Sequence, residues 1–392
     1  MKNILRIGML LCSFLLASVG WAMAQEGESG GGTTGITTLD ELKNAINSNA
    51  TEITLGGDIK DISEAITISR ALTLDSNGNT ISGSVSNGAL LEITGTGTVT
   101  IKNLTVANNT EDGGSEIYVG TNPDTSTEFP ATAASFENIK LSGTSEVGIA
   151  AEYHVNISIK NVQETSPHQM GVMLQGSDEQ LKASLTIEGT ENKFDKCVMP
   201  VVLNYSGDVT VEGSNFTELP LPKSEEGEVE SKAWTDRYNS TDKSYKITLQ
   251  DRDQKVVLME LQLIADLVEN GSDIEKLIFG AGTLDLTSWS PDGVFTINSS
   301  LAIEGAGSNP ENGGTKIVGQ IDIVSPDEKE NTPSSKAIVF KNLAIEGNTG
   351  TNGLLNVMTA NVDLLLEGVT LVSIRRNAHC MPWGLIVALR SQ

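Results

Sequence analysis

The chain has 392 residues, of which 51 are acidic and 26 basic, so its formal net charge is −25. This length allows two domains and a large buried interior. The acidic excess repels nucleic acid and anionic membrane surfaces, so we expect neither as a partner, and an anionic polymer would bind only if calcium bridged the like charges.

The first residues have the features of a secretory signal peptide. Lys2 and Arg6 precede an apolar run over 7–19, and Ala22-Met23-Ala24 supplies the small residues of a cleavage site. The apolar run is shorter than the roughly 20 residues that a membrane helix needs. We therefore predict a Sec-type signal cleaved after Ala24, no membrane insertion afterwards, and a secreted or cell-surface protein. Loss of two basic residues brings the charge of the mature chain to 24 − 51 = −27.

A short amphipathic helix is predicted after a flexible leader at 25–36. In "TTLDELKNAINSN" (37–49), Thr38 and Glu41 have the spacing of a capping box. The apolar residues of this segment fall on one helical face; they are Leu39, Leu42, Ala45 and Ile46. After Asn49 the helical period stops.

Brief alternating runs of β-branched and leucine residues follow, among them "EITLGGDI", "AITIS", "TVTIKNLTV", "VNISIKNV" and "DVTVEG". Gly, Asn, Ser or Asp bounds each run, which is typical of strands. Strands of about three to five residues are shorter than the five or six that ordinary sandwiches average. The pattern predicts instead a coil in which each turn contributes brief strands to parallel sheets.

A repeated corner position supports this prediction. Aligning Asn103, Asn138, Asn161, Gly189 and Gly213 gives steps of 35, 23, 28 and 24 residues, as expected of a β-solenoid with variable insertions. An asparagine side chain tolerates turn geometry and bonds both to backbone and to an asparagine on the next turn. We predict a structural ladder of Asn103, Asn138 and Asn161; the alternative is that asparagine is simply common in turns.

The order of segments repeats after a break. "LPLPKSEEGEVESK" (219–232) has the prolines and acids of a linker, and the helical run "LMELQLIADLVENG" (258–271) follows it. "KAIVFKNLAIEGN" then echoes "GTVTIKNLTVANN", which puts Asn342 at the ladder position of a second copy. The predicted organisation is a signal peptide at 1–24, a leader at 25–36, a β-helix domain at 37–218, a linker at 219–255, a second, shorter domain at 256–374 and an atypical tail at 375–392.

The tail, "RRNAHCMPWGLIVALRSQ", contains no acid and does not alternate. It is either sequence outside the pattern that follows a truncated second domain, or an apolar C-terminal cap that uses Leu385, Ile386, Val387 and Leu389. The mature chain has two cysteines, Cys197 and Cys380, which are too few for a disulfide framework. We interpret Cys197 as a small buried apolar residue.

The segments "ELKNAI", "ITLGGDI", "LTLDSNGNTISG" and "VTIKNLTV", in this order, resemble the right-handed parallel β-helix of pectate-lyase-like proteins. They are most similar to the pectate-lyase-like adhesive domains of bacterial surface and secreted proteins. The resemblance covers 38–110 well and 258–348 more loosely. It implies an all-β fold, a right-handed parallel β-helix (β-solenoid) in two tandem copies, each with a short N-terminal capping helix. This fold hosts both enzymes and binding proteins.

The enzymes of this fold need residues that the chain lacks. Pectate lyases combine a calcium-binding aspartate cluster with an arginine base, whereas Arg70, the only arginine between 25 and 218, falls between two predicted strands. Polygalacturonases need paired carboxylates, and the Asn-Thr-Asp, Asp-Asp and Gly-His-Gly motifs of that family do not occur. We therefore predict no catalytic, cofactor-binding or metal-binding residue.

Other polar and aromatic residues give weaker signals. His154 and His168 lie less than one turn apart, and we interpret them as surface or groove histidines rather than metal ligands. Two pairs of acids, Asp58 with Asp61 and Glu111 with Asp112, could each bind a calcium ion weakly. The alternative is that these are ordinary solvated acids. The aromatic residues available for stacking on sugars are Tyr118, Phe129, Tyr153, Tyr205, Trp234 and Trp289; the first four are expected to pack under loops.

These features favour a secreted or surface-exposed, non-catalytic protein. It would act as an adhesive module that binds an extracellular glycan or a surface protein. The alternative is a divergent polysaccharide lyase or glycoside hydrolase of the same fold, and a third interpretation is a stalk that provides only spacing.

Overall fold

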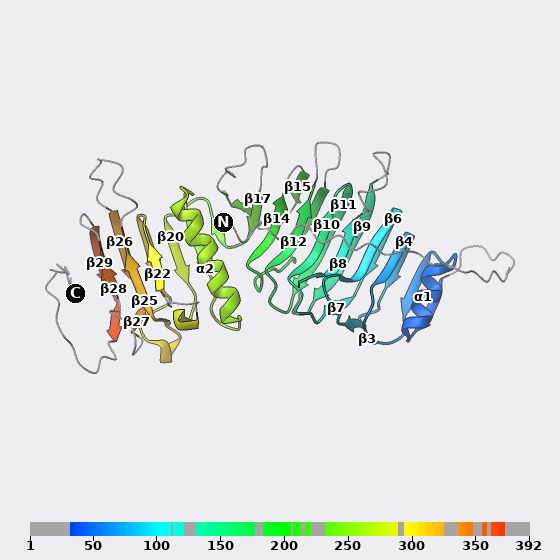
Figure 1. The fold of residues 1–392 in the computed structure, drawn as a ribbon, viewed down its shortest axis with the longest axis horizontal. Coiled ribbons are helices and arrows are strands. Elements are labelled where there is room, and N and C mark those ends of the chain that lie inside the picture. Colours follow the sequence, from blue (N-terminus) through cyan, green and yellow to red (C-terminus); the bar gives the residue numbers. More distant parts are fainter. Residues whose placement is uncertain are drawn as a thin grey trace.

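The computed structural model describes residues 32–110, 113–120, 131–176, 183–204, 207–212, 216–219, 221, 232–288, 294–324, 336–347, 355–358 and 362–372. These residues form a predominantly β structure with parallel sheets and two α-helices (Figure 1). The predicted signal peptide at 1–24 and the atypical tail at 375–392 lie outside the described residues.

The first helix, α1 (Leu39–Asn47), has the predicted capping box. The Thr38 side chain accepts a hydrogen bond from the Glu41 backbone N–H at 3.3 Å, and the Glu41 carboxylate accepts one from the Thr38 N–H at 3.1 Å. Two backbone donors at the helix start are thereby satisfied. Leu42, Ala45 and Ile46 are buried, as the helical period predicts. The prediction of this helix is confirmed.

Part of the predicted flexible leader is a strand. Residues Thr33–Ile36 form β1, which pairs in parallel with β2 (Glu52–Leu55). Ile36 is 3% exposed and joins the core beside Ile53 and Leu55. The burial of Ile36 and the backbone pairing with β2 hold this segment in place. The prediction of a flexible leader, which its glycine-rich sequence suggested, was therefore wrong for these residues.

The first stack, as we call the strands from β1 to β17, is one sheet in which neighbours pair in parallel except at its end. The strands after β2 are β3 (Ile59–Ile62), β4 (Ile66–Asp75), β5 (Thr80–Gly83), β6 (Ala89–Lys102), β7 (Thr105–Asn108), β8 (Ser115–Gly120), β9 (Thr132–Leu141), β10 (Val147–Glu152), β11 (Val155–Glu164), β12 (Met170–Gln175), β13 (Ala183–Glu188), β14 (Met199–Asn204), β15 (Gly207–Glu212), β16 (Thr217–Leu219) and β17 (Lys232–Thr235).

The register of the first stack matches the predicted steps. Lys102 pairs with Glu137, Glu137 with Lys160, Lys160 with Glu188, and Glu188 with Glu212. These residues are separated by 35, 23, 28 and 24 positions, and each directly precedes one of the corner residues aligned above. The predicted alignment is therefore confirmed for Asn103, Asn138, Asn161 and Gly189, whereas Gly213 lies outside the described residues.

Several strands are longer than predicted. β4 has 10 residues because the runs "AITIS" and "ALTLD" join in one strand, and β6 has 14 because "LLEIT" and "TVTIK" join. β9 and β11 also have 10 residues each. The expectation of strands of three to five residues was wrong for these segments. The pairing between β4 and β6 shifts register on both sides of Arg70, so the chain turns the corner through an irregularity without ending the strand.

Inward side chains stack in columns through the core. One column follows successive parallel pairs from β4 to β14, and its members are at most 3% exposed: Ile68, Ile93, Val119, Ala151, Leu174 and Leu203. Burial of one aliphatic side chain of this size contributes roughly 1.5–3 kcal/mol. Each member contacts the residues before and after it, so the core extends along the stack.

Helix α2 (Gln254–Glu269) lies between the two groups of strands in Figure 1. It begins four residues before the predicted segment because the Asp253 carboxylate accepts a hydrogen bond from the Lys255 N–H at 2.7 Å and caps the helix. Leu261, Ile264 and Val268 are buried as predicted, whereas Ala265 is only partly buried.

The second stack, our name for β18 to β30, consists of three sheets. Its pairings are parallel apart from the β18–β19 hairpin. The strands are β18 (Tyr238–Asn239), β19 (Ser244–Ile247), β20 (Lys276–Phe279), β21 (Gly282–Asp285), β22 (Val294–Ile297), β23 (Leu301–Glu304), β24 (Thr315–Val318), β25 (Gln320–Ile323), β26 (Lys336–Lys341), β27 (Ala344–Glu346), β28 (Leu355–Val357), β29 (Val362–Glu367) and β30 (Thr370–Val372).

The predicted linker at 219–255 contributes strands to both stacks. β17 pairs antiparallel with β14 and with β16 at the end of the first stack. β19 pairs in parallel with β20 and so belongs to the second stack. Residues 220 and 222–231 of the linker lie outside the described residues. The domain boundaries themselves stay predictions.

Candidate functional site

Three of the four predicted ladder asparagines meet at one corner of the first stack. Asn103, Asn138 and Asn161 have φ angles of 55°, 58° and 55°, in the left-handed region that asparagine tolerates better than most residues. The Asn138 amide donates to Asn103 Oδ1 at 3.0 Å, and the Asn161 amide donates to Asn138 Oδ1 at 2.7 Å. The side chains thus bridge three strands that are adjacent in the sheet.

Other polar residues extend this row, and Asn342 stands apart from it. Asn103 donates to Asp75 Oδ1 at 3.0 Å, and Gln163 donates to Asn161 Oδ1 at 2.9 Å. Asn342 lies in the second stack with a φ of 52°, between Gly305 and Gly368 in the register. Neither glycine offers a side-chain amide, so the geometry of the corner recurs there without asparagine partners.

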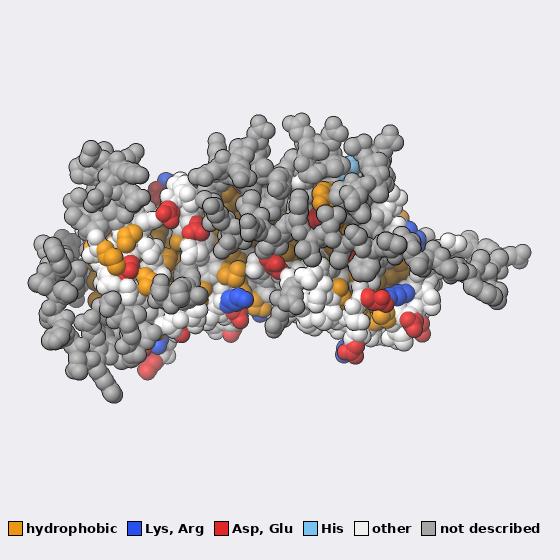
Figure 2. All heavy atoms as spheres, in the orientation of Figure 1, with side chains coloured by type: hydrophobic (Ala, Val, Ile, Leu, Met, Phe, Trp, Pro, Cys, Tyr) orange, Lys and Arg blue, Asp and Glu red, His pale blue; other side chains and the backbone are white. Residues whose placement is uncertain are grey.

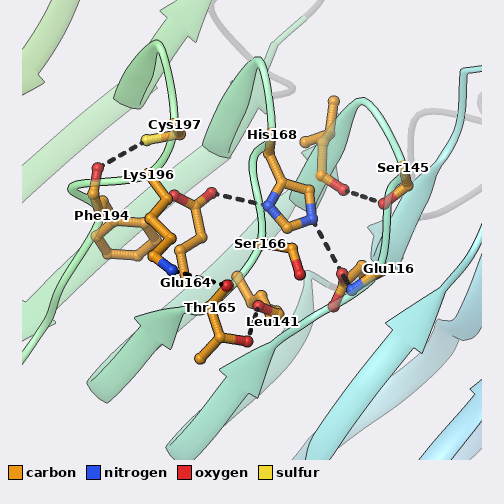
Figure 3. Close-up of polar contacts among 12 residues, drawn as sticks. Glu116, Leu141, Ser145, Glu164, Thr165, Ser166, His168, Phe194, Lys196 and Cys197 are labelled. Carbon is orange, nitrogen blue, oxygen red and sulfur yellow. Dashed lines mark hydrogen bonds and ion pairs between the residues drawn. The ribbon is translucent and has the colours of Figure 1, made fainter. Parts of the chain in front are cut away.

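A buried cluster of charged residues lies between β8, β11 and β12 (Figure 3). The His168 ring is 2.9 Å from Glu116 through Nε2 and 3.2 Å from Glu164 through Nδ1, and all three side chains are 0% exposed. Glu116 also accepts hydrogen bonds from the backbone N–H groups of Ser142 and Gly143. The interpretation of His168 as a surface or groove histidine was therefore wrong, because two carboxylates enclose it within the fold.

The two carboxylates keep His168 protonated. Burial by itself lowers the pKa of the imidazole, but the hydrogen bonds and charges of Glu116 and Glu164 outweigh burial and raise the pKa to about 10. Burial raises the pKa of the Glu116 carboxyl, although His168, Gly143 and Ser142 oppose the rise. At neutral pH the imidazolium therefore ties together residues from β8, the end of β11 and the loop before β12.

Cys197 lies near this cluster and is 0% exposed, which confirms its interpretation as a small buried residue. Its thiol donates a hydrogen bond to the Phe194 carbonyl oxygen at 3.0 Å. Burial raises the pKa of the thiol well above its ordinary value, which disfavours the reactive thiolate. Cys380 lies outside the described residues.

Arg70 holds the end of α1. Its Nε donates to the Ile46 carbonyl at 2.8 Å, Nη2 to the Ala45 carbonyl at 3.1 Å, and Nη1 to the Ala71 carbonyl at 3.3 Å. The last carbonyls of a helix have no partner inside the helix, and a nearby cation is favourable there. The guanidinium thus fixes the capping helix to the corner between the two segments of β4.

A second buried cluster lies where the first stack meets α2. Glu260 accepts hydrogen bonds from Arg237 at 2.6 Å, from Arg252, and from the Tyr245 hydroxyl at 2.8 Å. Burial disfavours the charged guanidinium, but Glu260 outweighs burial and raises the pKa of Arg237 above its ordinary value. The two arginines also donate to three backbone carbonyls of the segment before β14, at Phe194, Cys197 and Val198. This network links the two stacks.

Sequence reasoning missed these buried charges. Glu260 had a local signal, since it lies three residues after Val257 and four before Ile264 on the apolar face of α2. In the cluster around His168 only Glu164 is close in the sequence, four residues away, whereas Glu116 is 52 residues away.

An open groove of about 490 Å³ lies at the end of the first stack, between β14, β15, β16 and β17. Hydroxyl, carboxylate, ammonium, indole and aliphatic groups line it, from Leu203, Asp208, Val209, Thr210, Glu218, Lys232 and Trp234. Among the described strands, β15 pairs only with β13, so its other edge adjoins this groove. Trp234 is 8% exposed and mostly packs on the core.

The other aromatic candidates are partly buried or not described. The Tyr118 hydroxyl donates to Glu152 Oε2 at 3.3 Å on the outer face of the first stack. Burial raises the pKa of Glu152 and of Tyr118 above their ordinary values. Tyr153 is half-buried with a φ of 66°. Phe129, Tyr205 and Trp289 lie outside the described residues.

Of the two acid pairs predicted as calcium candidates, the structure describes Asp58 and Asp61. Asp58 accepts a hydrogen bond from the Thr80 N–H at 2.9 Å and pairs with Lys60 at 3.1 Å, and these contacts hold its pKa below the ordinary value. Asp61 has a φ of 58°. Glu111 and Asp112 lie outside the described residues. Within the described ranges, no group of three or more His, Cys, Asp or Glu side chains is arranged to hold a metal ion. His154 is half-buried.

No helix in the described part of the chain combines the length and apolar character that crossing a bilayer requires.

Comparisons with protein-family models and with curated proteins gave no match. The solved structure titled "L. reuteri 53608 SRRP" is 13% identical with a TM-score of 0.29, over 87% of this chain and 99% of that chain. "L. reuters 100-23 SRRP" is 12% identical with a TM-score of 0.22, over 89% and 100%. Both TM-scores are low, so fold and function have to be inferred from this chain's own residues.

Proposed function

We propose that this chain is a secreted or surface-exposed, non-catalytic right-handed parallel β-helix protein. It acts as an adhesive module that binds an extracellular glycan or a surface protein, without nucleic acid or membrane insertion. The β-helix assignment is supported by parallel pairs separated by 23–35 residues along β6, β9, β11, β13 and β15. Connections between parallel strands of one sheet are right-handed in about 98% of cases.

The groove beside Trp234 is the observation that carries the binding role. Its lining offers carboxylates and an ammonium that exchange hydrogen bonds with hydroxyl or amide groups, together with an aromatic and aliphatic wall. Asp208 and Glu218 are exposed and Lys232 is half-exposed, so their polar atoms are accessible. The mixture suits a neutral glycan or a peptide better than an anionic polymer, given the charge of −25.

The bonding of Arg70 supports the non-catalytic part of the proposal. An arginine base has to face the substrate with a free nitrogen, whereas Nε, Nη1 and Nη2 of Arg70 each donate to a backbone carbonyl. His168 and Glu116 are likewise enclosed at 0% exposure. The contacts of Arg70, His168 and Glu116 thus stabilise the fold.

Binding is tested on a glycan array and on immobilised extracellular proteins with the purified mature chain. We expect a ligand whose binding falls at least about tenfold, or about 1.4 kcal/mol, in Asp208→Ala and Glu218→Ala. Glu188→Ala, an exposed acid on β13, is the matched control and should bind as the parent does. No ligand on either surface, or equal binding by all variants, would contradict the proposal.

The alternative, a divergent polysaccharide lyase or glycoside hydrolase, is tested by turnover. The chain is incubated with calcium and a panel of uronate polymers, and both unsaturated products and new reducing ends are measured. We expect neither. Robust turnover that Arg70→Ala abolishes, in a variant with an unchanged circular dichroism spectrum, would establish the enzyme instead. Mass spectrometry of the secreted protein should find Gln25 as the first residue.

A further inference from the structure

The second stack ends in an exposed sheet edge. The terminal strands, by which we mean β28, β29 and β30, pair in parallel with β25, β26 and β27. Each terminal strand stands last in the order of its sheet among the described residues. The outer edges of three sheets therefore face the same end of the molecule with their backbone N–H and C=O groups.

This end is also apolar. All the large hydrophobic side chains that are exposed in the described part of the chain lie on the terminal strands or next to them, with exposures of 61% for Met358, 37% for Leu365, 47% for Leu371 and 41% for Val372. Leu371 is in register with Ile345, which is 0% exposed. Figure 2 shows apolar side chains gathered over β28 and β29. The row of inward side chains that contains Ile345 therefore ends at an exposed residue, Leu371.

Near the beginning of each stack an amphipathic helix packs on the core, unlike at the terminal strands. Helix α1, which follows β1, buries Leu42 and Ile46 near the beginning of the first stack, and α2, which follows β18 and β19, buries Leu261 and Ile264 near the beginning of the second. An amphipathic segment at such a place covers an apolar cross-section that water would otherwise contact. The same physical requirement applies to the terminal strands.

A second copy of the chain is a poor occupant of this end. Asp363 and Glu367 are exposed on β29, and Glu367 pairs with Lys341 at 3.0 Å, but the whole chain carries a net charge of −25. Two such ends in contact would bring like charges together from two strongly acidic molecules. The occupant should instead be apolar and basic.

The residues that follow β30 have this composition. Residues 373–392, outside the described structure, contain Arg375, Arg376 and Arg390, no acid, and the apolar run "GLIVAL" at 384–389. The eleven residues from 373 to 383 span up to about 36 Å when extended, which is enough to bring this run back to any point of the end.

We propose that residues 373–392 fold back and cover the terminal strands, with the 384–389 run on the apolar surface around Leu371. The contact is intramolecular: it buries apolar area and brings three arginines onto a chain whose net charge is −25. This contact does not depend on which ligand binds in the groove beside Trp234.

The test compares the full mature chain with a variant that ends at Val372, with Ile386→Asp, and with the control Ser391→Asp. The full chain and the control should sediment as monomers and give little enhancement of the fluorescence of anilinonaphthalene sulfonate, a dye that binds exposed apolar surface. The truncated chain and Ile386→Asp should raise the dye signal several-fold. Amides of β29 and β30 should exchange faster in both variants, while amides of β11 and β13 stay protected and show that the fold persists.

Two results would overturn the proposal. Equal dye binding and equal exchange of β29 and β30 in the full and truncated chains would show that the tail does not cover this end. A full chain that sediments as a dimer, with protection that disappears on dilution, would assign the surface to a second copy. If truncation unfolds the chain, Ile386→Asp and an Arg375→Glu, Arg376→Glu double variant decide between these outcomes.

Discussion

Arg237 Nη1 lies 2.6 Å from Glu260 Oε1, in a buried ion pair where the first stack meets helix α2. Glu260 is also the counterion of Arg252. We expect Glu260→Gln to lower the free energy of unfolding by about 3–5 kcal/mol, because two buried guanidinium groups lose the carboxylate that they share. Chemical denaturation measures the change.

The exposed pair of Lys43 and Glu64 provides the control for this prediction. Glu64→Gln should change stability little, since water screens such surface pairs. The role assigned to Glu260 is contradicted if Glu260→Gln is as stable as Glu64→Gln. Hydrogen exchange should locate the loss at α2 and β14 rather than at α1.

The asparagine ladder predicts a difference between two substitutions at one position. Asn138→Ala should destabilise the fold by about 1–3 kcal/mol, because alanine loses two amide bonds and is strained at a φ of 58°. Asn138→Gly loses the same bonds without the strain and should cost less. Equal losses for alanine and glycine would show that backbone conformation is not part of the asparagine's role.

Stability should fall as the solution becomes alkaline. The pKa of His168 rises from an ordinary 6.5 to about 10 in the fold, so the folded state binds the proton more tightly than the unfolded state. The resulting stabilisation is fully present below about pH 6.5 and is lost as pH rises through about 10, by on the order of a few kcal/mol. Unfolding curves between pH 6 and 10 measure this slope.

His168→Gln should flatten that pH dependence, and His154→Gln, at a half-buried position, should keep it. The variant at 168 should also be less stable at pH 6, since Glu116 and Glu164 lose the cation between them. A parental slope in His168→Gln would mean that other groups cause the alkaline loss.

The bonds of Arg70 predict a local effect on α1. Arg70→Met keeps the aliphatic part of the side chain but removes the donors to Ala45 and Ile46, and it should cost about 1–3 kcal/mol. Amides of α1 should exchange faster than those of β12. Arg70→Lys restores one charged donor and should recover part of the loss. Unchanged exchange in α1 for Arg70→Met would contradict the capping role.

The sequence predicted the stacking register well. Side chains alternate with a period of two in each strand, and the corners recur at Asn103, Asn138 and Asn161, so short-range patterns determine which residues align. It predicted strand length poorly. β6 passes through a corner at Gly95 and Gly97, where these glycines read as breaks although the backbone pairing continues.

The buried charges could not be inferred in the same way. His168 lies in the polar run "QETSPHQ" at 163–169, which is typical of an exposed loop, and only the fold brings Glu116 to it from β8. Arg237 similarly meets Glu260 through the packing of α2 on the first stack. Such pairs depend on distances between elements, which alternation and turn residues do not encode.

Along the corner of the first stack, the residues of each turn pair with those of the turn before and the turn after. A gene duplication of one such segment would therefore add a new layer of about 4.8 Å without altering any existing contact except at the insertion point. Steps as different as 23 and 35 residues coexist in one register. Copy number can thus evolve independently of the sequence that each loop displays.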